Sequence, residues 1–288
     1  MQIGDRKRSL GLFSLVSVLL IAILVYGVQA FNSPSACSGQ WTSCSNAFSD
    51  NTNSATASVS GTANKSGIWN DYGFSLSSSD QINKVVVRAD FFASKTSGYI
   101  VVRVSGDGGL TYGPSHTVGG NTAEQSFFID VTNDLSWAPS KLNNSNLRVN
   151  VTCSKIGGGA NPTCNLDWIP VNVTYTPCIR ANPTVTLNPP ERNGSAGQTV
   201  NYTTKVINND NNACGASTFD LTATFPLGWS GSFNTTTLLI DPGQLKMAEF
   251  LLTSENNATA GNYTFNTKAT NSGAPSLNGN RSGYYVVT

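Results

Sequence analysis

Apolar and polar residues alternate in short runs from about residue 37 to the C-terminus, and no long stretch has helical periodicity. Successive side chains of a β-strand point to opposite faces, so this alternation indicates strands with one buried face. Gly, Asn, Ser and Pro separate the runs, and these residues favour turns. The pattern therefore predicts an all-β protein.

Residues 31–177 are predicted to form a first domain, a jelly-roll-like β-sandwich. So many short strands indicate two packed antiparallel sheets. The candidate strands are ATASVSG, GIWNDYGFSL, INKVVVRADFFA, GYIVVRVSG, EQSFFIDV, NLRVNVTCS and LDWIPVNVTYT.

The segment TPCIRANP is predicted to be a domain boundary. Pro177 follows the last predicted strand of the first domain, and Pro183 precedes the first predicted strand of the second. Residues 178–288 then contain about seven short strands with turn signals between them, which is typical of an Ig-like sandwich. The predicted strands are TVTLNPP, QTVNYTTKVINND, STFDLTATF, LLID, KMAEFLLTS, GNYTFNTKATNSG and SGYYVVT.

An uncharged apolar run from Leu10 to Val28 follows the basic cluster Arg6, Lys7 and Arg8. As a helix it would span roughly 28 Å, close to the bilayer core of about 30 Å. The basic flank stays inside, so the rest of the chain is predicted to be extracellular. Residues 1–30 are thus a hydrophobic helix that acts as a signal peptide or a membrane anchor.

Three interpretations remain for this N-terminal segment. Val28-Gln29-Ala30 fits cleavage after Ala30, which would give a secreted protein, whereas the length of the apolar run favours a retained anchor. A pilin-like segment is a third possibility, although no Gly directly follows the basic cluster.

The six cysteines support export, because an even number in an exported chain indicates disulfides. Fifteen pairings are possible in principle. The sequence has no C-x-x-C motif and a single histidine, so a zinc site is disfavoured. Sequence proximity favours the pairs Cys37–Cys44, Cys153–Cys164 and Cys178–Cys214.

Charged residues make up 11% of the chain and the formal net charge is +1, so nothing suggests the basic face that nucleic acids require. A surface of Ser, Thr, Asn and Gly is common in extracellular β modules. N-glycosylation sequons permit a glycoprotein. They start at Asn64, Asn143, Asn150, Asn172, Asn193, Asn201, Asn234, Asn257, Asn262 and Asn280.

The stretch VSGDGGLTYGP contains Ser105, Asp107, Gly109, Thr111 and Tyr112 in the order S-x-D-x-G-x-T-aromatic. It resembles the Asp-box, a hairpin motif of sialidases and other extracellular β proteins. The Asp and Thr side chains of such a hairpin bond the turn backbone, the glycines adopt conformations that other residues resist, and the aromatic ring packs inward. We therefore expect a structural turn.

A catalytic function is not expected. Sialidases repeat the Asp-box across propeller blades and need clustered arginines with a Tyr nucleophile, whereas Arg88, Arg103 and Arg148 have no such framework here. His116 lies in GPSHTVGG, which is predicted to be a loop, and no G-x-S-x-G elbow is present. The protein is predicted to be a non-enzyme.

Acidic residues near the strands could form a carboxylate pair or bind calcium, although solvated or turn-capping roles are favoured. No D-x-D-x-D loop is present, so no cofactor is expected and Ca²⁺ is kept as the alternative. The residues considered are Asp71, Asp90, Asp130 and Asp167, with Asp107 and Asp134 added for calcium.

Aromatic residues are concentrated in the first domain and could stack on a sugar ring, although core filling claims most aromatics of a sandwich. Trp41, Trp69 and Trp137 are the candidate glycan-stacking residues. The other aromatics considered are Tyr72, Tyr99, Tyr112 and Trp168.

The second domain carries AGQTVNYTTKVINND, FPLGWSGSF, IDPGQLKMAEFLLTS and ATAGNYTFNTKATN. These segments resemble the NPCBM-associated Ig-like modules of secreted prokaryotic proteins, which are similar to CARDB adhesion modules. The resemblance implies extracellular spacing or attachment rather than catalysis. Within it, Trp229 is expected at a strand start, where its indole can cap the core.

These observations favour a non-enzymatic secreted or cell-surface protein with a binding or display sandwich and an Ig-like spacer or adhesion module. The expected partner is an extracellular glycan or protein, with the membrane as a second partner if the N-terminal segment is retained. Two alternatives are a carbohydrate-binding accessory of a longer extracellular hydrolase and a self-assembling surface-layer or pilus-like subunit.

Overall fold

A computed structural model describes residues 28–158 and 160–288, and almost all of their regular structure is β. The only helical elements in this part of the chain are two short 3₁₀ turns, η1 (Cys44–Ala47) and η2 (Pro139–Lys141). The all-β prediction is confirmed. Residues 1–27, which hold nearly all of the predicted hydrophobic helix, lie outside the described residues. No helix within the described ranges is long and apolar enough to span a bilayer.

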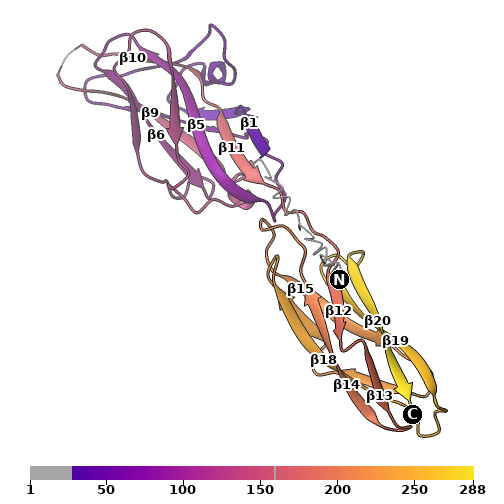
Figure 1. The fold of residues 1–288 in the computed structure, drawn as a ribbon. Coiled ribbons are helices and arrows are strands. Elements are labelled where there is room, and N and C mark those ends of the chain that lie inside the picture. The colour runs from indigo at the N-terminus through magenta and orange to yellow at the C-terminus, as the bar shows by residue number, and fades with distance from the viewer. Residues whose placement is uncertain (1–27, 159) are drawn as a thin grey trace, which may run out of the picture.

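The strands of residues 28–176 form two antiparallel sheets that pack as a sandwich (Figure 1). The first sheet has the order β1-β11-β5-β10-β3, and β8 pairs with β5. Its strands are β1 (Val28–Asn32), β3 (Ala55–Ser58), β5 (Gln81–Ala93), β8 (Gln125–Asp130), β10 (Thr163–Trp168) and β11 (Val171–Thr176). The second sheet has the order β2-β4-β9-β6-β7. Its strands are β2 (Ala36–Gly39), β4 (Lys65–Asn70), β6 (Gly98–Gly106), β7 (His116–Gly119) and β9 (Leu147–Lys155).

The core of this sandwich follows from the alternation along its strands. In β9, Leu147, Val149 and Val151 are buried while Arg148 and Asn150 are partly exposed. Strand β5 likewise buries Val85 and Val87 against the facing sheet. Each of these strands thus buries one face between the two sheets, as expected for a sandwich.

Three local predictions for this sandwich were wrong. GIWNDYGFSL is a strand only as far as Asn70, because the backbone of Asp71 is left-handed. LDWIPVNVTYT forms two strands rather than one, because the chain breaks at Ile169-Pro170 between β10 and β11. The Pro170 nitrogen has no hydrogen to donate, and its carbonyl accepts a bond from the Arg88 backbone N–H of β5 at 3.0 Å. The expected loop GPSHTVGG contains a strand, β7, which begins at His116 and pairs with β6.

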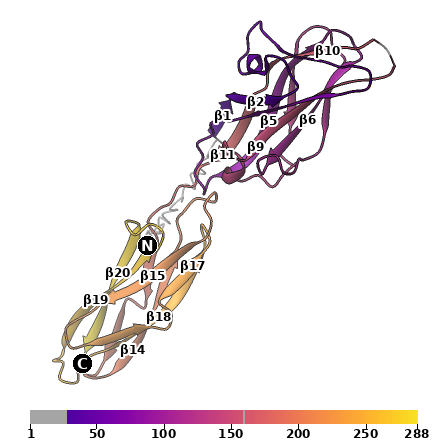
Figure 2. The same ribbon diagram turned by 180° about the vertical axis from the view of Figure 1, so that it is seen from behind.

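The strands of residues 184–287 form a second pair of sheets (Figure 2). One has the order β12-β14-β18-β16 and the other the order β13-β20-β19-β15-β17. The strands are β12 (Thr184–Asn188), β13 (Glu191–Gly194), β14 (Thr199–Ile207), β15 (Ser217–Thr224), β16 (Ser230–Phe233), β17 (Thr237–Ile240), β18 (Leu245–Thr253), β19 (Gly261–Asn271) and β20 (Asn278–Val287). Strands β13 and β20 run parallel, and the other pairs are antiparallel.

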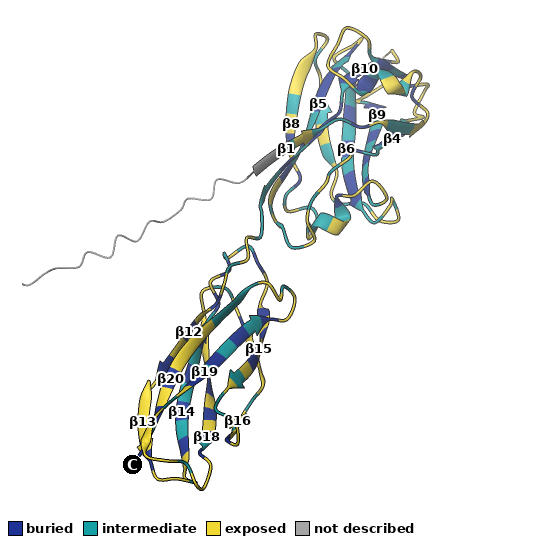
Figure 3. Ribbon diagram, turned by 90° about the vertical axis from the view of Figure 1, so that its right-hand side faces the viewer, coloured by how far each residue is buried: buried dark blue, intermediate teal, exposed yellow. Residues whose placement is uncertain are grey.

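Buried and exposed residues alternate along these strands as well (Figure 3). The largest core side chains are aromatic, and they include Tyr202, Phe250 and Phe265. Trp229 is buried and packs against Tyr263 and Tyr285, as expected for an indole that caps the core. The Tyr285 hydroxyl donates to the Ser195 and Gln198 carbonyls at 3.1 and 2.9 Å, which fastens the β13–β14 turn to β20.

All three predicted disulfides are present: Cys37–Cys44, Cys153–Cys164 and Cys178–Cys214. No cysteine among the described residues is free. Three disulfides and no free thiol indicate an oxidising compartment.

The third disulfide belongs to a polar cluster at the start of the second pair of sheets. The buried Asp210 carboxylate accepts from the Ala181 backbone N–H at 2.9 Å and pairs with Arg180 at 3.3 Å. The Ser217 hydroxyl donates to the same carboxylate at 2.7 Å. The segment after Cys178 is therefore fixed to the β14–β15 loop by both covalent and polar contacts.

Candidate functional site

The Asp-box-like hairpin follows β6, and its polar side chains bond its own turn. The Asp107 carboxylate accepts from the Thr111 backbone N–H at 3.0 Å and from the Thr111 hydroxyl. The Ser105 hydroxyl donates to Asp107 at 2.7 Å and accepts from the Gly109 N–H at 3.0 Å. The Arg103 guanidinium lies 5.3 Å from the Tyr112 ring centre. The bonds to Asp107 match the expected structural turn, whereas Tyr112, which was expected to pack inward, is half-buried beside Arg103 and is not among the residues packed against the core.

The hydrogen bonds from Ser105 and Thr111 hold the pKa of Asp107 well below its ordinary value. A depressed carboxylate pKa contributes stability above the unfolded-state pKa of about 3.9, and this contribution is lost as the pH falls toward the folded-state value. We therefore expect Asp107→Asn to lower the melting temperature of the N-terminal sandwich at pH 7, with a difference from wild type that shrinks below about pH 4.

Thermal unfolding of the wild type and the variant between pH 7 and pH 2.5 measures this difference. A difference that stays constant across that range would contradict the assigned role of the carboxylate.

The expected role of Trp41 and Trp69 in glycan stacking is wrong. Trp41 is 5% exposed and Trp69 is 0% exposed, and the two rings pack edge to face with centres 5.6 Å apart. The Trp69 indole donates to the Cys44 carbonyl at 3.1 Å, and that of Trp41 to the Val151 carbonyl at 3.1 Å. Burial between the sheets beside the Cys37–Cys44 loop removes both faces from any ligand.

Trp137 is half-buried and packs against the same core, and its indole N–H donates to the Val131 carbonyl at 2.9 Å. Since the other two tryptophans are internal, the three residues do not form one exposed platform. A glycan surface on this sandwich needs other side chains.

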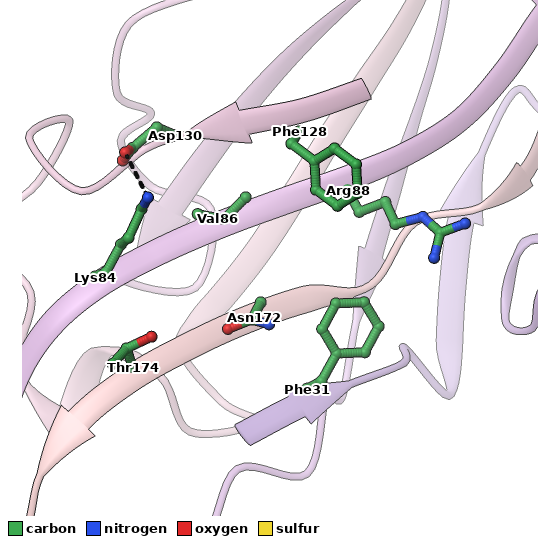
Figure 4. A pocket seen from close by; sticks show the side chains of 8 residues that line it. All are labelled: Phe31, Lys84, Val86, Arg88, Phe128, Asp130, Asn172 and Thr174. Carbon is green, nitrogen blue, oxygen red and sulfur yellow. Dashed lines mark ion pairs between the residues drawn. The ribbon is translucent and has the colours of Figure 1, made fainter. Parts of the chain in front are cut away.

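A groove of about 280 Å³ lies on the outer face of the first sheet, where β1, β11, β5 and β8 lie side by side (Figure 4). Each strand contributes the alternate residues whose side chains point away from the core. In β5 these are Lys84, Val86 and Arg88, whose neighbours Val85 and Val87 are buried. The lining residues are Phe31, Lys84, Val86, Arg88, Phe128, Asp130, Asn172 and Thr174.

Two exposed aromatic rings flank the groove. Phe31 of β1 is 40% exposed and Phe128 of β8 is 68% exposed. Phe31 packs edge to face on Trp168 with ring centres 5.1 Å apart, and the Trp168 indole donates to the Ser33 hydroxyl at 2.9 Å. Phe31 is therefore held in place by its neighbours while part of its surface stays open to a ligand.

The Arg88 guanidinium is fixed from several sides. Its Nε donates to the Asp90 carboxylate at 2.9 Å. Its Nη2 lies 2.7 Å from the same carboxylate and 3.3 Å from that of Asp50. Its carbon lies 4.6 Å from the Trp168 ring centre and 5.8 Å from that of Phe128. Arg88 thus links the aromatic rings into a single rigid surface.

Carboxylates balance the basic residues of the groove. Lys84 pairs with Asp130 at 3.5 Å, and Arg88 is shared by Asp90 and Asp50. Burial and the neighbouring acids raise the pKa of Glu124, and burial together with Asp50 and Asp90 raises that of Asp167 despite a bond from the Asn51 N–H. This end of the sheet is acidic, so it does not favour an anionic ligand.

The remaining acidic candidates have separate structural contacts. Asp134 pairs with His116 at 2.7 Å, Asp71 has a left-handed backbone at the end of β4, and Asp130 accepts from the Thr132 N–H at 3.0 Å. Within residues 28–158 and 160–288, no three His, Cys, Asp or Glu side chains are grouped so that they could hold a metal ion. The expectation of no cofactor, with Ca²⁺ as the alternative, stays a prediction.

Sequence reasoning missed both phenylalanines of the groove. Phe128 lies on the same face of β8 as Ser126 and Asp130. The alternation along QSFFID therefore already indicates that its side chain points outward. Phe31 directly follows the segment predicted to be a signal peptide or an anchor, and no strand was expected there.

No family model matches the chain, and the comparison with curated proteins gives no match. Among solved structures, a FixG-related protein from Vibrio parahaemolyticus has 14% identity and a TM-score of 0.30, over 38% of this chain and 98% of the other. A β-1,2-glucanase from Parabacteroides distasonis has 10% identity and a TM-score of 0.31, over 92% of this chain and 37% of the other. The N-terminal domain of a Streptococcus gordonii adhesin has 8% identity and a TM-score of 0.24, over 78% of this chain and 60% of the other. These distant likenesses say nothing about a ligand, and the resemblance to NPCBM-associated modules stays a prediction.

Proposed function

We propose that this chain is a non-enzymatic extracellular binding protein whose N-terminal sandwich holds a neutral glycan in the groove between Phe31 and Phe128. The C-terminal Ig-like sandwich acts as the spacer that presents it. The observation that carries this proposal is the pair of exposed rings on one sheet face, with polar side chains between them.

The lining of the groove matches the surface of a pyranose. One face of such a sugar carries C–H groups that pack on an aromatic ring, and its edge carries hydroxyls that need hydrogen-bond partners. Phe31 and Phe128 supply the apolar surface, whereas Asn172, Thr174 and the Lys84–Asp130 pair supply donors and acceptors. A neutral sugar meets these requirements without opposing the carboxylates around Arg88.

The contacts of the acidic residues support a binding role over catalysis. A hydrolase that uses two carboxylates needs one of them free to donate a proton and the other free to attack or activate water. Here Asp90 is held by Arg88, and Asp167 accepts from the Asn51 backbone N–H at 3.0 Å. Both side chains are buried and contribute to the scaffold of the groove.

The spacer role of the second sandwich is supported by the way in which it starts. The Cys178–Cys214 disulfide and the Asp210 contacts fix the first residues of this unit to the β14–β15 loop. A fixed start is suited to a module that positions another one, because little chain there is left free to bend.

An oligosaccharide array with neutral and acidic members, followed by calorimetry on the best binder, tests the proposed function. We expect binding to a neutral oligosaccharide, and we expect Phe128→Ala to weaken it at least about tenfold, since the ring supplies the packing surface. Tyr284→Ala is the matched control, because it removes an aromatic ring with 42% exposure from the other sandwich and should leave the affinity unchanged.

Binding that Phe128→Ala leaves intact would place the ligand elsewhere. An array without any bound glycan would contradict the proposal as a whole. Stronger binding to acidic sugars than to neutral ones would contradict the charge argument.

A further inference from the structure

Strand β1 crosses the position at which a signal peptidase would cut after Ala30. The five residues of β1 pair antiparallel with β11, in the register Val28↔Tyr175, Ala30↔Val173 and Asn32↔Val171. Three of these five residues, Val28 to Ala30, precede the predicted cleavage point. A chain that begins at Phe31 would therefore lose more than half of this strand.

The rest of β1 is fastened to the sandwich by side chains. Phe31 packs on Trp168, and the Asn32 amide donates to the Tyr72 carbonyl at 2.6 Å. Cleavage after Ala30 would also place a new positively charged α-amino group on Phe31, which lines the groove beside Lys84 and Arg88. The stretch just after the proposed cut is thus part of the folded sandwich rather than a free terminus.

Strand β1 also covers the edge of β11, whose other edge pairs with β5. Without residues 28–30, the backbone groups of β11 opposite them, from Val173 to Tyr175, would lose their partner. An uncovered edge of this kind is a site for unwanted strand pairing. The strand therefore has a structural purpose that cleavage after Ala30 would remove.

We infer that Val28, Gln29 and Ala30 remain in the mature protein, so that Val28-Gln29-Ala30 is a β-strand and not a processing site. The mature N-terminus lies at Val28 or upstream of it. Gly27 is a small residue two positions after Val25, so a cut after Gly27 would leave all of β1 in place. A retained N-terminal segment would do so as well, and neither outcome depends on the glycan proposal.

The decisive measurement is the intact mass of the protein, expressed from Met1 in a bacterium that exports it and recovered from both the membrane and the medium. A mass that corresponds to a start at Val28, or to any start upstream, supports the inference. A mass that corresponds to a start at Phe31 overturns it.

A matched pair of purified chains tests the physical reason. One begins at Val28 and the other at Phe31, and they differ by three residues. We expect the N-terminal sandwich of the shorter chain to melt about 5 °C lower, with the C-terminal transition unchanged. Equal melting temperatures would show that residues 28–30 add nothing to the fold, which would also overturn the inference.

Discussion

A chain that carries both Cys178→Ser and Cys214→Ser should lose about 4 kcal/mol of stability in its C-terminal sandwich. The disulfide spans a sequence separation of 36 residues, and a cross-link of this length removes much of the conformational freedom of the unfolded chain. The N-terminal sandwich has its own core, so its unfolding transition should not move. Denaturant unfolding with tryptophan fluorescence as the probe measures both transitions.

The Cys37–Cys44 pair provides the matched control. Its sequence separation is 7, so its replacement by serines should cost about 2.5 kcal/mol and affect the N-terminal transition alone. If either double variant shifted both transitions, the two sandwiches would share stability and the separation of their cores would be contradicted.

Replacement of Trp69 by alanine should be the most damaging single change in the N-terminal sandwich, with a loss of about 3–5 kcal/mol. The side chain is fully buried, packs on Trp41, and donates to the Cys44 carbonyl, so its removal leaves a large cavity and an unpaired carbonyl. Chemical denaturation of the purified variant measures the loss.

Phe128→Ala is the matched comparison, because its ring is largely exposed and its removal should change stability by about 0.5 kcal/mol or less. The two variants separate an aromatic residue of the core from one of the groove. A Trp69→Ala protein with wild-type stability that had lost glycan binding would contradict both assignments.

Alternation alone was enough to predict the longer strands, because one buried face per strand is a local property of the sequence, whereas the short strands β1, β2, β7 and β13 were missed. Strand β9 shows this most clearly, since its period of two persists from Leu147 to Val151. The disulfides were also predictable, because short separations between cysteines left few reasonable partners. The sandwich predicted for the second half is present in its strands, while the resemblance to NPCBM-associated modules stays a prediction.

The sequence could not show that two strands, β10 and β11, pair with the same neighbouring strand, β5. Strand β5 pairs with β11 through its first half and with β10 through its second half, so LDWIPVNVTYT follows one edge of β5 and is interrupted only at Ile169-Pro170, where Pro170 has no N–H to donate. The sequence also could not separate buried from exposed tryptophans. An indole ring suits both the core and the surface of a sandwich, and only the packing of the facing sheet decides between them. The groove depends on β1, whose residues looked like the end of a targeting segment.

The parallel pair β13–β20 has a mechanical consequence. Its register runs from Glu191↔Tyr284 to Gly194↔Val287. A force that draws the beginning of this sandwich away from the end of β20 slides the two strands along each other, so the evenly spaced bonds between them share the load at once. Strands that are peeled apart instead release their bonds one at a time. The C-terminal sandwich is therefore suited to carry tension along the direction of β13 and β20.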